Sequence, residues 1–420
     1  MKEATKDIFD KINKYLLTFL KWTFLSVIIG IICGLIGTLF HVCVERATEI
    51  RTNNPEIIVL LPIAGVFIVF LYKMAHMEND KGTNLVIESI RTAEKVPALM
   101  APLIFIATFL THLFGGSAGR EGAALQIGGS VAATVGRLFK MKEDDIRLIT
   151  MCGMSAMFAA LFGTPLTATV FAMEVISVGV IYYTALVPCS FAAVIGTLVA
   201  KKFGINSVSY KIANFPTVDI ITIIKVVILA MLCAGVSIIF CIAMAKSSKL
   251  YKKYLKNQYM RALIGGILVV LLTFMLGTFD YNGAGMDVVE RAINGKAVSV
   301  AFILKIVFTA ITLGAGFRGG EIVPTFFIGA TFGCVVGPIL GLDASFAAAI
   351  ALVAMFCSVV NCPLAAMILS IELFSSTDVM LFAIACAVSY MMSGYYGLYS
   401  SQKIMYSKLT PSFVNRNTKH

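Results

Sequence analysis

The sequence predicts an all-α, polytopic membrane protein, and three observations carry that prediction. Of the 420 residues, 59% are hydrophobic and only 14% are charged, and the mean hydropathy is +0.89. A chain of this composition has too little polar surface to cover a soluble globule. Apolar runs of helical length occupy nearly the whole chain, and the second half repeats motifs of the first half.

The apolar runs differ in length, and several are shorter than the roughly 20 residues that a full membrane span requires. Short or glycine- and proline-interrupted runs in both halves are typical of the broken helices of transporters, although core helices of any bundle can also be short. The internal repeat favours broken helices. The runs lie at about 20–44, 56–72, 97–114, 123–139, 147–162, 165–200, 220–246, 260–278, 298–313, 323–340, 345–358, 363–375 and 379–394.

An internal repeat relates the two halves of the chain. Segment 119–128 corresponds to segment 320–329, an offset of 201 residues. Segment 162–168 corresponds to 360–366 at an offset of 198 residues, and in each case a proline precedes a glutamate by nine residues. Chance similarity between glycine-rich apolar segments is the alternative, but two ordered pairs at nearly one offset disfavour it. Two related halves predict a pseudo-two-fold axis, with the functional site where they meet near the membrane midplane.

The same features predict two membrane repeats between two terminal segments. The first repeat is expected at 20–212 and the second at 213–402, after a cytoplasmic amphipathic helix at 1–19 and before a cytoplasmic tail at 403–420. Residues 1–19 mix charged and apolar side chains at near-helical spacing, as helices on a membrane surface do.

The net charge of +11 indicates membrane topology rather than nucleic-acid binding. The lysines gather at the ends of apolar runs, notably between Lys246 and Arg261. Positive residues mark the cytoplasmic side of a membrane protein. That loop and both termini are therefore expected in the cytoplasm, in a multi-pass protein of the cell membrane.

Arg120 and Glu121 are ionisable residues inside an otherwise apolar, glycine-rich stretch. Charges at membrane depth are costly and usually face a cavity or an ion pathway. Glu121 is therefore the first candidate functional residue. A structural ion pair with Arg120 is the alternative, and it is disfavoured because neighbouring side chains tend to diverge.

Glycine-rich segments beside apolar helices form candidate anion sites. Gly119 and Gly122 relax the chain before a long apolar run, so backbone N–H groups can converge with the positive end of a helix dipole and bind an anion. Gly320 precedes a helix opened by Val323 and Pro324, and proline suits the first turn of a helix. The second half therefore offers a matching site.

A third glycine loop contains Gly82, Thr83 and Asn84. Its hydroxyl and amide groups could be directed at the same ion, or they could simply cap the following helix. The residues alone leave both interpretations open.

Taken in order, these motifs resemble the CLC family of anion channels and anion/proton antiporters. The resemblance covers nearly the whole chain, and a lone G-R-E-G motif would be a much weaker signal. It implies a homodimer with one pore per subunit, each pore built from an inverted repeat. The motifs are the glycine loop at 82–84, G-R-E-G at 119–122 followed by Q-I-G-G at 126–129, the loop at 319–324, and G-L-Y-S at 397–400.

The resemblance also implies roles for individual residues. Glu121, the glutamate of G-R-E-G, would be the gate, competing with the anion when ionised and moving away when protonated. Tyr399 would donate its phenol hydroxyl to the anion from the cytoplasmic side. The anion-binding residues expected from the motifs are Gly82, Thr83, Asn84, Gly119, Arg120, Gly122, Gly320, Ile322, Val323 and Tyr399.

Elementary electrostatics supports a link between protons and anions at Glu121. In a narrow, poorly hydrated pore, desolvation and a nearby anion both raise the proton affinity of a carboxylate. Proton binding and anion binding are then coupled. Such coupling produces an exchanger if neither side opens freely to both ions, and a leaky gate produces a channel.

Departures from the commonest chloride pattern favour the bacterial fluoride/proton antiporter branch. Ala123 and Val86 replace expected prolines, and Val175 stands where chloride/proton exchangers have an inner proton glutamate. Glu321 adds a carboxylate beside the second glycine loop, so it is expected to be a second proton-handling acid. Glu174 is then expected to be structural, as is Glu372 in the second half.

The preferred prediction is an antiporter that exports fluoride in exchange for protons. Val323 counts against it, because fluoride-type loops often have threonine there, and Thr83 is a hydroxyl like the chloride-type serine. A chloride/proton antiporter or a voltage-gated chloride channel is the alternative. An ion pair between Glu321 and Arg318 would also count against fluoride.

Other classes of protein are disfavoured by what the sequence lacks. No paired acids, metal-ligand histidines or nucleophile with its base occur at suitable spacing, so neither enzyme activity nor a metal or cofactor is expected. The ten cysteines are scattered without C-x-x-C pairs and are expected to be small core residues. The expected partners are fluoride or chloride, protons, membrane lipid and a second copy of the chain, without nucleic acid.

Overall fold

The computed structural model describes residues 2–92, 94–375 and 378–419. Residues 1 and 420, at the outer ends of the expected N-terminal helix and C-terminal tail, lie outside this part of the chain. Sixteen α-helices form almost all of the described structure, which confirms the all-α prediction. Two short 3-10 helices, η1 (Pro55–Leu60) and η2 (Tyr183–Ala185), accompany them.

The helices fall into two series of eight that correspond in order. The first series is α1 (Lys2–Asn53), α2 (Leu61–Met74), α3 (Thr83–Arg91), α4 (Met100–Leu113), α5 (Glu121–Leu138), α6 (Glu143–Phe162), α7 (Pro165–Glu174) and α8 (Leu186–Lys202). The second series is α9 (Ile220–Tyr254), α10 (Gln258–Leu276), α11 (Met286–Ile293), α12 (Ala301–Gly314), α13 (Ile322–Ile339), α14 (Ala344–Val360), α15 (Pro363–Phe374) and α16 (Met380–Met392).

Matching lengths confirm the repeat. Helices α4 and α12 have 14 residues each, α5 and α13 have 18 each, and α3 and α11 are short, with 9 and 8. Helices shorter than a full span at equivalent places in both halves are the broken helices expected of a transporter.

The break between α6 and α7 has the same construction as the break between α14 and α15. Gly163 ends α6 in the left-handed conformation at φ 69°, and Asn361 ends α14 in that conformation at φ 56°. Two residues later Pro165 and Pro363 begin the next helices. A left-handed cap followed by a helix-initiating proline turns the chain sharply in both halves.

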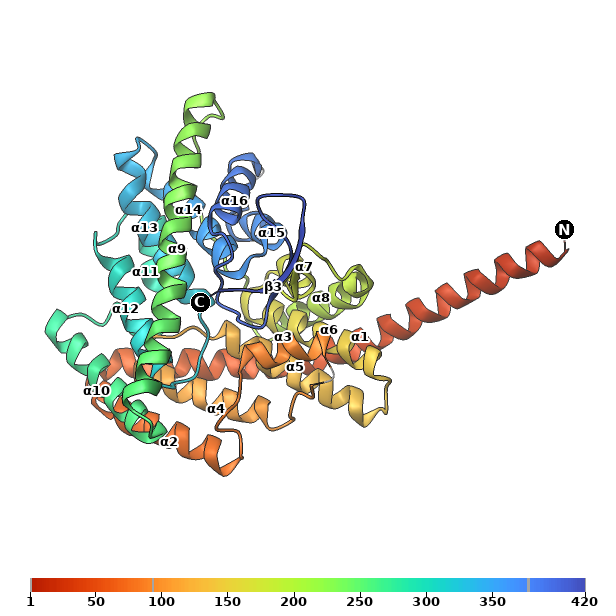
Figure 1. Ribbon diagram of the computed structural model, residues 1–420, viewed down its shortest axis with the longest axis horizontal. Coiled ribbons are helices and arrows are strands. Elements are labelled where there is room, and N and C mark those ends of the chain that lie inside the picture. The colour runs from red at the N-terminus through yellow and green to blue at the C-terminus, as the bar shows by residue number, and fades with distance from the viewer. Residues whose placement is uncertain (1, 93, 376–377, 420) are drawn as a thin grey trace.

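Several helices are suited to crossing a membrane. Seven are long and apolar enough to span it, and five more apolar helices have 10 to 17 residues, among the described residues. Helix α1 runs without a break from Lys2 to Asn53, so residues 2–19 continue directly into the first span, and this N-terminal part projects away from the other helices (Figure 1). The protein is therefore a multi-span membrane protein.

Close helix packing in each half depends on glycine. A Cβ added to Gly128 in α5 would lie 2.2 Å from the Gly153 carbonyl oxygen in α6. A Cβ added to Gly333 in α13 would lie 2.2 Å from the Ala347 carbonyl oxygen in α14. Small residues that let helix backbones approach are typical of packing in membranes.

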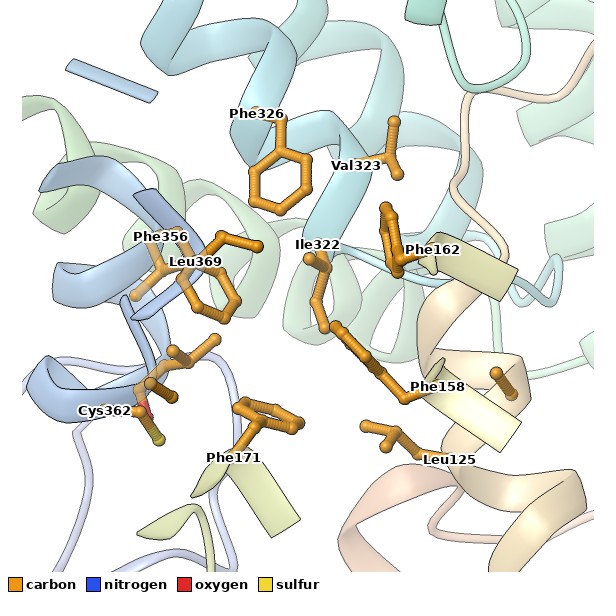
Figure 2. Packing of buried hydrophobic residues seen from close by; sticks show 14 of the residues in the cluster. Leu125, Phe158, Phe162, Phe171, Ile322, Val323, Phe326, Phe356, Cys362 and Leu369 are labelled. Carbon is orange, nitrogen blue, oxygen red and sulfur yellow. The ribbon is translucent and has the colours of Figure 1, made fainter. Parts of the chain in front are cut away.

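Aromatic side chains from both halves meet in the centre of the core (Figure 2). The ring centroids of Phe158 and Phe171 are 5.4 Å apart, and those of Phe171 and Phe356 are 5.9 Å apart. Phe326 lies 5.6 Å from Phe356 and completes the connection to α13. One apolar cluster therefore joins the two halves.

Two glutamates join the halves by reciprocal helix capping. The carboxylate of Glu174, at the end of α7, accepts hydrogen bonds from the backbone N–H groups of Leu364 (3.2 Å) and Ala365 (2.9 Å) in the first turn of α15. The carboxylate of Glu372, in α15, accepts from Leu166 (2.9 Å) and Thr167 (2.8 Å) in the first turn of α7. Carboxylates stabilise helix N-termini, so both contacts agree with the structural roles expected for these residues.

A small sheet was not expected from the helical pattern. Strand β1 (Ser177–Val178) pairs in parallel with β2 (Lys403–Tyr406), which pairs antiparallel with β3 (Phe413–Asn417). The segment 403–419 is thus folded onto the helices rather than extended. Thr418 donates a hydrogen bond of 2.6 Å to the carbonyl oxygen of Tyr399, so this hairpin also supports the candidate site.

Candidate functional site

The two halves meet at a pair of glycines that correspond in the repeat. Gly119 N–H donates to the Gly320 carbonyl, and Gly320 N–H donates to the Gly119 carbonyl, at 2.7 Å each. A Cβ on Gly320 would lie 2.5 Å from the Gly122 nitrogen, so a larger residue would separate the backbones. Helices α5 and α13 begin directly after this bridge, and two helix N-termini therefore converge on one place.

Glu121 is fully buried beside this bridge. Its Oε2 accepts a hydrogen bond of 2.9 Å from the Arg120 backbone N–H, and the Val323 N–H of the other half lies near the same carboxylate. Its Oε1 has no hydrogen-bond partner among the described residues. The carboxylate thus occupies a position where helix N-termini would attract an anion.

The expectation that Arg120 and Glu121 diverge is wrong. The Arg120 Nε lies 3.8 Å from the Glu121 Oε1, which is ion-pair distance but too long for a hydrogen bond. Arg120 precedes the first helical residue, with φ −114° and ψ −11°, so helical side-chain directions do not apply to it. The pair is loose, since its short contact uses the Arg120 backbone instead.

Two cavities contain most of the expected site residues. The smaller, of about 130 Å³ and called the inner cavity below, is lined by five of them: Gly82, Thr83, Asn84, Glu321 and Tyr399. The larger, of about 1060 Å³ and called the outer cavity below, is lined by Arg120 and Glu121, together with His112 and the end of α1. The two carboxylates therefore face different cavities, with the glycine bridge close to both.

The inner cavity contains buried polar atoms without protein partners. Glu321 Oε2, Tyr399 Oη and Gln126 Oε1 have no hydrogen-bond partner among the described residues. A buried polar atom that lacks a partner costs about 1–3 kcal/mol. Three such atoms in one cavity indicate that a polar ligand or water completes them.

Thr83 and Gln126 form a hydrogen-bonded unit in this cavity. Gln126 donates from its amide to the Thr83 hydroxyl (3.1 Å) and to the Gly122 carbonyl (3.2 Å), and Thr83 donates to the same carbonyl (3.2 Å). Gln126 was not assigned a role from the sequence. Its position could have revealed one, because it is the polar side chain one turn after Gly122 on an apolar helix.

Asn84, expected to bind the anion, is instead largely engaged in hydrogen bonds with the protein. Its Oδ1 accepts hydrogen bonds from the Ser401 N–H (3.0 Å) and the Ser401 hydroxyl (3.1 Å). Arg91, also on α3, donates to the Ser401 carbonyl. Helix α3 therefore fixes the loop of Tyr399, and only the amide nitrogen of Asn84 is left for a ligand.

Ile322 and Val323 turn their side chains away from polar surroundings. Both lie among the aromatic side chains of the core, near Phe162 and Phe326 (Figure 2). They can contact an anion only through their backbone N–H groups at the start of α13. Glu321, next to them, forms no ion pair with Arg318, because Arg318 lies 3.7 Å from Asp80 instead.

Residues 64–394 match the family model of the voltage gated chloride channel. The chain belongs to the voltage-gated chloride channel (CLC) family. This CLC protein is 35% identical over 395 residues to the chloride/fluoride channel protein of Pseudomonas syringae pv. tomato, covering 92% of this chain and 87% of the relative. It is 24% identical over 410 residues to an H(+)/Cl(−) exchange transporter of Vibrio cholerae, covering 89% and 86%.

Solved structures agree with this family assignment. The crystal structure of a CLC-type fluoride/proton antiporter matches with a TM-score of 0.88 at 30% identity, covering 91% of this chain and 98% of that chain. A slow cyanobacterial Cl−/H+ antiporter matches with a TM-score of 0.77 at 19% identity, covering 89% and 94%, which shows the shared fold. The predicted CLC fold is thus confirmed, and the protein is a CLC anion transporter from a family of transporters and channels rather than enzymes.

Proposed function

We propose that this CLC protein is a fluoride/proton antiporter, which exports fluoride in exchange for protons through one pore in each subunit of a homodimer. The observation that carries the proposal is the placement of two buried carboxylates beside the glycine bridge. Glu121 faces the outer cavity, and Glu321 faces the inner one with an oxygen that has no protein partner. The fluoride-related names of two relatives at 30% identity or more support the choice of ion.

The inner cavity has the chemistry of a small anion site. The Tyr399 hydroxyl, which has no partner among the described residues, can turn its proton toward a ligand, and the Thr83 hydroxyl can do so by giving up its hydrogen bond to the Gly122 carbonyl. Fluoride is small and heavily hydrated, so a dehydrated site must offer close polar donors to compensate for the lost water. The backbone N–H groups at the starts of α5 and α13, which face the Glu121 carboxylate, offer a second position for an anion.

Glu321 links the anion to a proton. When ionised, its carboxylate can only accept hydrogen bonds, and it repels an anion in the same cavity. When protonated, its O–H group can donate a hydrogen bond to a fluoride ion. Fluoride binding in the inner cavity therefore favours protonation of Glu321, and the reverse holds by linkage.

Glu121 acts as the outer gate in this proposal. When ionised, the carboxylate accepts a hydrogen bond from the Arg120 N–H and occupies the place of an anion at the helix N-termini. Protonation removes its charge and releases it toward the outer cavity, which is large enough to receive the side chain. The ionised carboxylate and an anion from inside therefore compete for one position, and a proton from outside frees that position for the anion, as exchange requires.

The orientation of the cavities follows from the positive residues. The Lys246 to Arg261 turn between α9 and α10 is placed in the cytoplasm by its charge. Helix α10 runs from that turn to the 279–287 loop, which lines the outer cavity. The Glu121 cavity then faces outward, the Glu321 cavity faces the cytoplasm, and both termini are cytoplasmic.

Chloride transport, coupled or channel-like, is the second candidate function. Thr83 supplies a hydroxyl like that of chloride-type loops, and Val323 supplies none. The exchange transporter of Vibrio cholerae also favours this alternative.

Flux measurements on reconstituted protein separate the two functions. Liposomes loaded with fluoride or chloride are followed with an ion-selective electrode while external pH is recorded. We expect fluoride efflux with opposite proton movement and little chloride efflux. Fast chloride efflux without proton movement would instead identify a chloride channel, and coupled chloride efflux would identify a chloride/proton antiporter.

A further inference from the structure

A second inner cavity adjoins the cavity of Glu321. It has a volume of about 290 Å³, against about 130 Å³ for the Glu321 cavity, and the two share Leu313, Phe317 and Arg318. Its border includes Lys252 and Arg261 at the turn between α9 and α10. Because that turn marks the cytoplasmic end, this cavity lies between the cytoplasm and Glu321.

Asp80 is a buried carboxylate in the lining of this second cavity. Its side chain is 0% exposed, and neither oxygen has a hydrogen-bond partner among the described residues. The Arg318 Nη1 faces its Oδ2 at 3.7 Å, which is beyond hydrogen-bond distance. The cavity beside this carboxylate is large enough to hold several water molecules, and a rotation of the Asp80 side chain into the cavity would bring its oxygens into contact with them.

Asp80 faces a fixed cation. Arg318 lines both cavities and lies over the Tyr72 ring at 4.2 Å, so its guanidinium stays beside Asp80. Lys81 is turned away, because its ammonium binds Glu88 (2.9 Å) and Glu94 (3.0 Å). The titratable and charged groups that face this cavity are Tyr72, Glu78, Asp80, Lys252, Arg261 and Arg318.

Glu174, the acid nine residues after Pro165, is not free for this role. Both carboxylate oxygens of Glu174 accept backbone hydrogen bonds from α15. Protons that reach Glu321 therefore need another route to the cytoplasm.

We propose that Asp80 is the internal proton-transfer residue, which receives the proton released by Glu321 and passes it to the cytoplasm. The O–H bond of Glu321 breaks and an O–H bond forms on Asp80, with water in the two adjoining cavities carrying the proton between them. No co-reactant other than water is needed. The inference rests on the proposed anion/proton exchange.

The test compares Asp80→Asn with wild type in proteoliposomes that report anion efflux and external pH together. Asparagine cannot carry the proton, so proton flux should fall roughly tenfold or more and the anion-to-proton ratio should rise. Asp80→Glu should retain coupling. Asp144→Asn is the matched control, because the Asp144 side chain is 93% exposed and pairs only with Arg147 among the described residues.

Two outcomes separate this inference from the proposed function. Wild-type anion flux without proton flux would overturn the proposed exchange itself. If the wild type couples the two fluxes, an Asp80→Asn variant with the same anion-to-proton ratio would overturn only the role of Asp80. The same conclusion would follow if both fluxes of the variant fell in proportion.

A second variant keeps the inference testable if Asp80→Asn does not fold. Arg318→Gln removes the cation that faces Asp80 at 3.7 Å. The dependence of proton flux on internal pH should then differ from that of the wild type. An unmoved pH dependence would contradict the proposed role.

Discussion

At the scale of single residues, the site is defined by polar atoms that the protein leaves unsatisfied. Glu121 has one bonded and one free oxygen, whereas Glu321 and Tyr399 each leave a buried oxygen without a partner in the described structure. Glu174, by contrast, has both oxygens bonded. Buried carboxylates of similar surroundings therefore separate into functional candidates and structural ones by their hydrogen bonds.

Glu121→Gln is expected to imitate the permanently protonated gate. Glutamine keeps the size of the side chain but cannot release a proton, so proton flux should fall by roughly 100-fold while anion flux continues. Parallel recording of anion efflux and external pH measures both fluxes. Glu45→Gln is the control, because Glu45 lines the same outer cavity with a side chain that is 69% exposed. An anion-to-proton ratio equal to that of wild type would remove Glu121 from the gate.

At the scale of elements, irregular segments position the site and helices hold those segments. Helix α3 fixes the Tyr399 loop through Asn84, and the C-terminal hairpin fixes the same loop through Thr418. Tyr399 itself is 2% exposed and lies in neither a helix nor a strand. Its position therefore depends on contacts from two elements, of which α3 is distant in the sequence and the hairpin follows directly.

Thr418→Val is expected to weaken anion binding although Thr418 does not line the inner cavity. Valine keeps the volume but removes the hydrogen bond to the Tyr399 carbonyl, a loss of about 1 kcal/mol or about fivefold in affinity. Titration calorimetry with fluoride measures the effect, and Tyr399→Phe shows the loss of the hydroxyl itself. Thr410→Val, at the exposed hairpin tip, is the control. If Tyr399→Phe weakens binding and Thr418→Val does not, the hairpin does not position Tyr399.

At the scale of the whole molecule, the two halves are joined by pairs of contacts, and the two residues of each pair occupy equivalent positions in the repeat. Gly119 and Gly320 exchange backbone hydrogen bonds, and Glu174 and Glu372 each cap a helix of the opposite half. Membrane packing gains little from hydrophobic burial between helices, so such polar contacts contribute strongly to specificity. The candidate site is thus a junction between the halves rather than a property of either half.

Glu174→Gln and Glu372→Gln are expected to destabilise the protein in the same way. Each loses one charge-assisted hydrogen bond at a helix N-terminus, worth about 1–2 kcal/mol. The effect should be larger for Glu174, which is 5% exposed, than for the half-buried Glu372. Thermal unfolding in detergent measures both, with Glu143→Gln in the exposed first turn of α6 as control. A changed anion-to-proton ratio in a stable Glu174→Gln protein would contradict its structural role.

The sequence by itself determined the features that are local or periodic along the chain. Composition and apolar runs predicted a helical membrane protein, and the glycines of 119–122 and 319–320 predicted backbone N–H groups converging at the starts of two helices. The offset of 201 residues predicted which of these segments correspond. Each of these signals depends only on neighbouring residues or on a comparison of the chain with itself.

Only the tertiary structure decided which polar atoms are paired. It brought Ser401 to Asn84, Arg318 to Asp80, and Arg120 close to Glu121 despite the expected divergence. The first two contacts join residues that are more than 200 positions apart, so no local pattern contains them. Their physical cause is the packing of two inverted halves, which sets the donors available to each buried oxygen and hence which carboxylates keep an oxygen without a hydrogen bond.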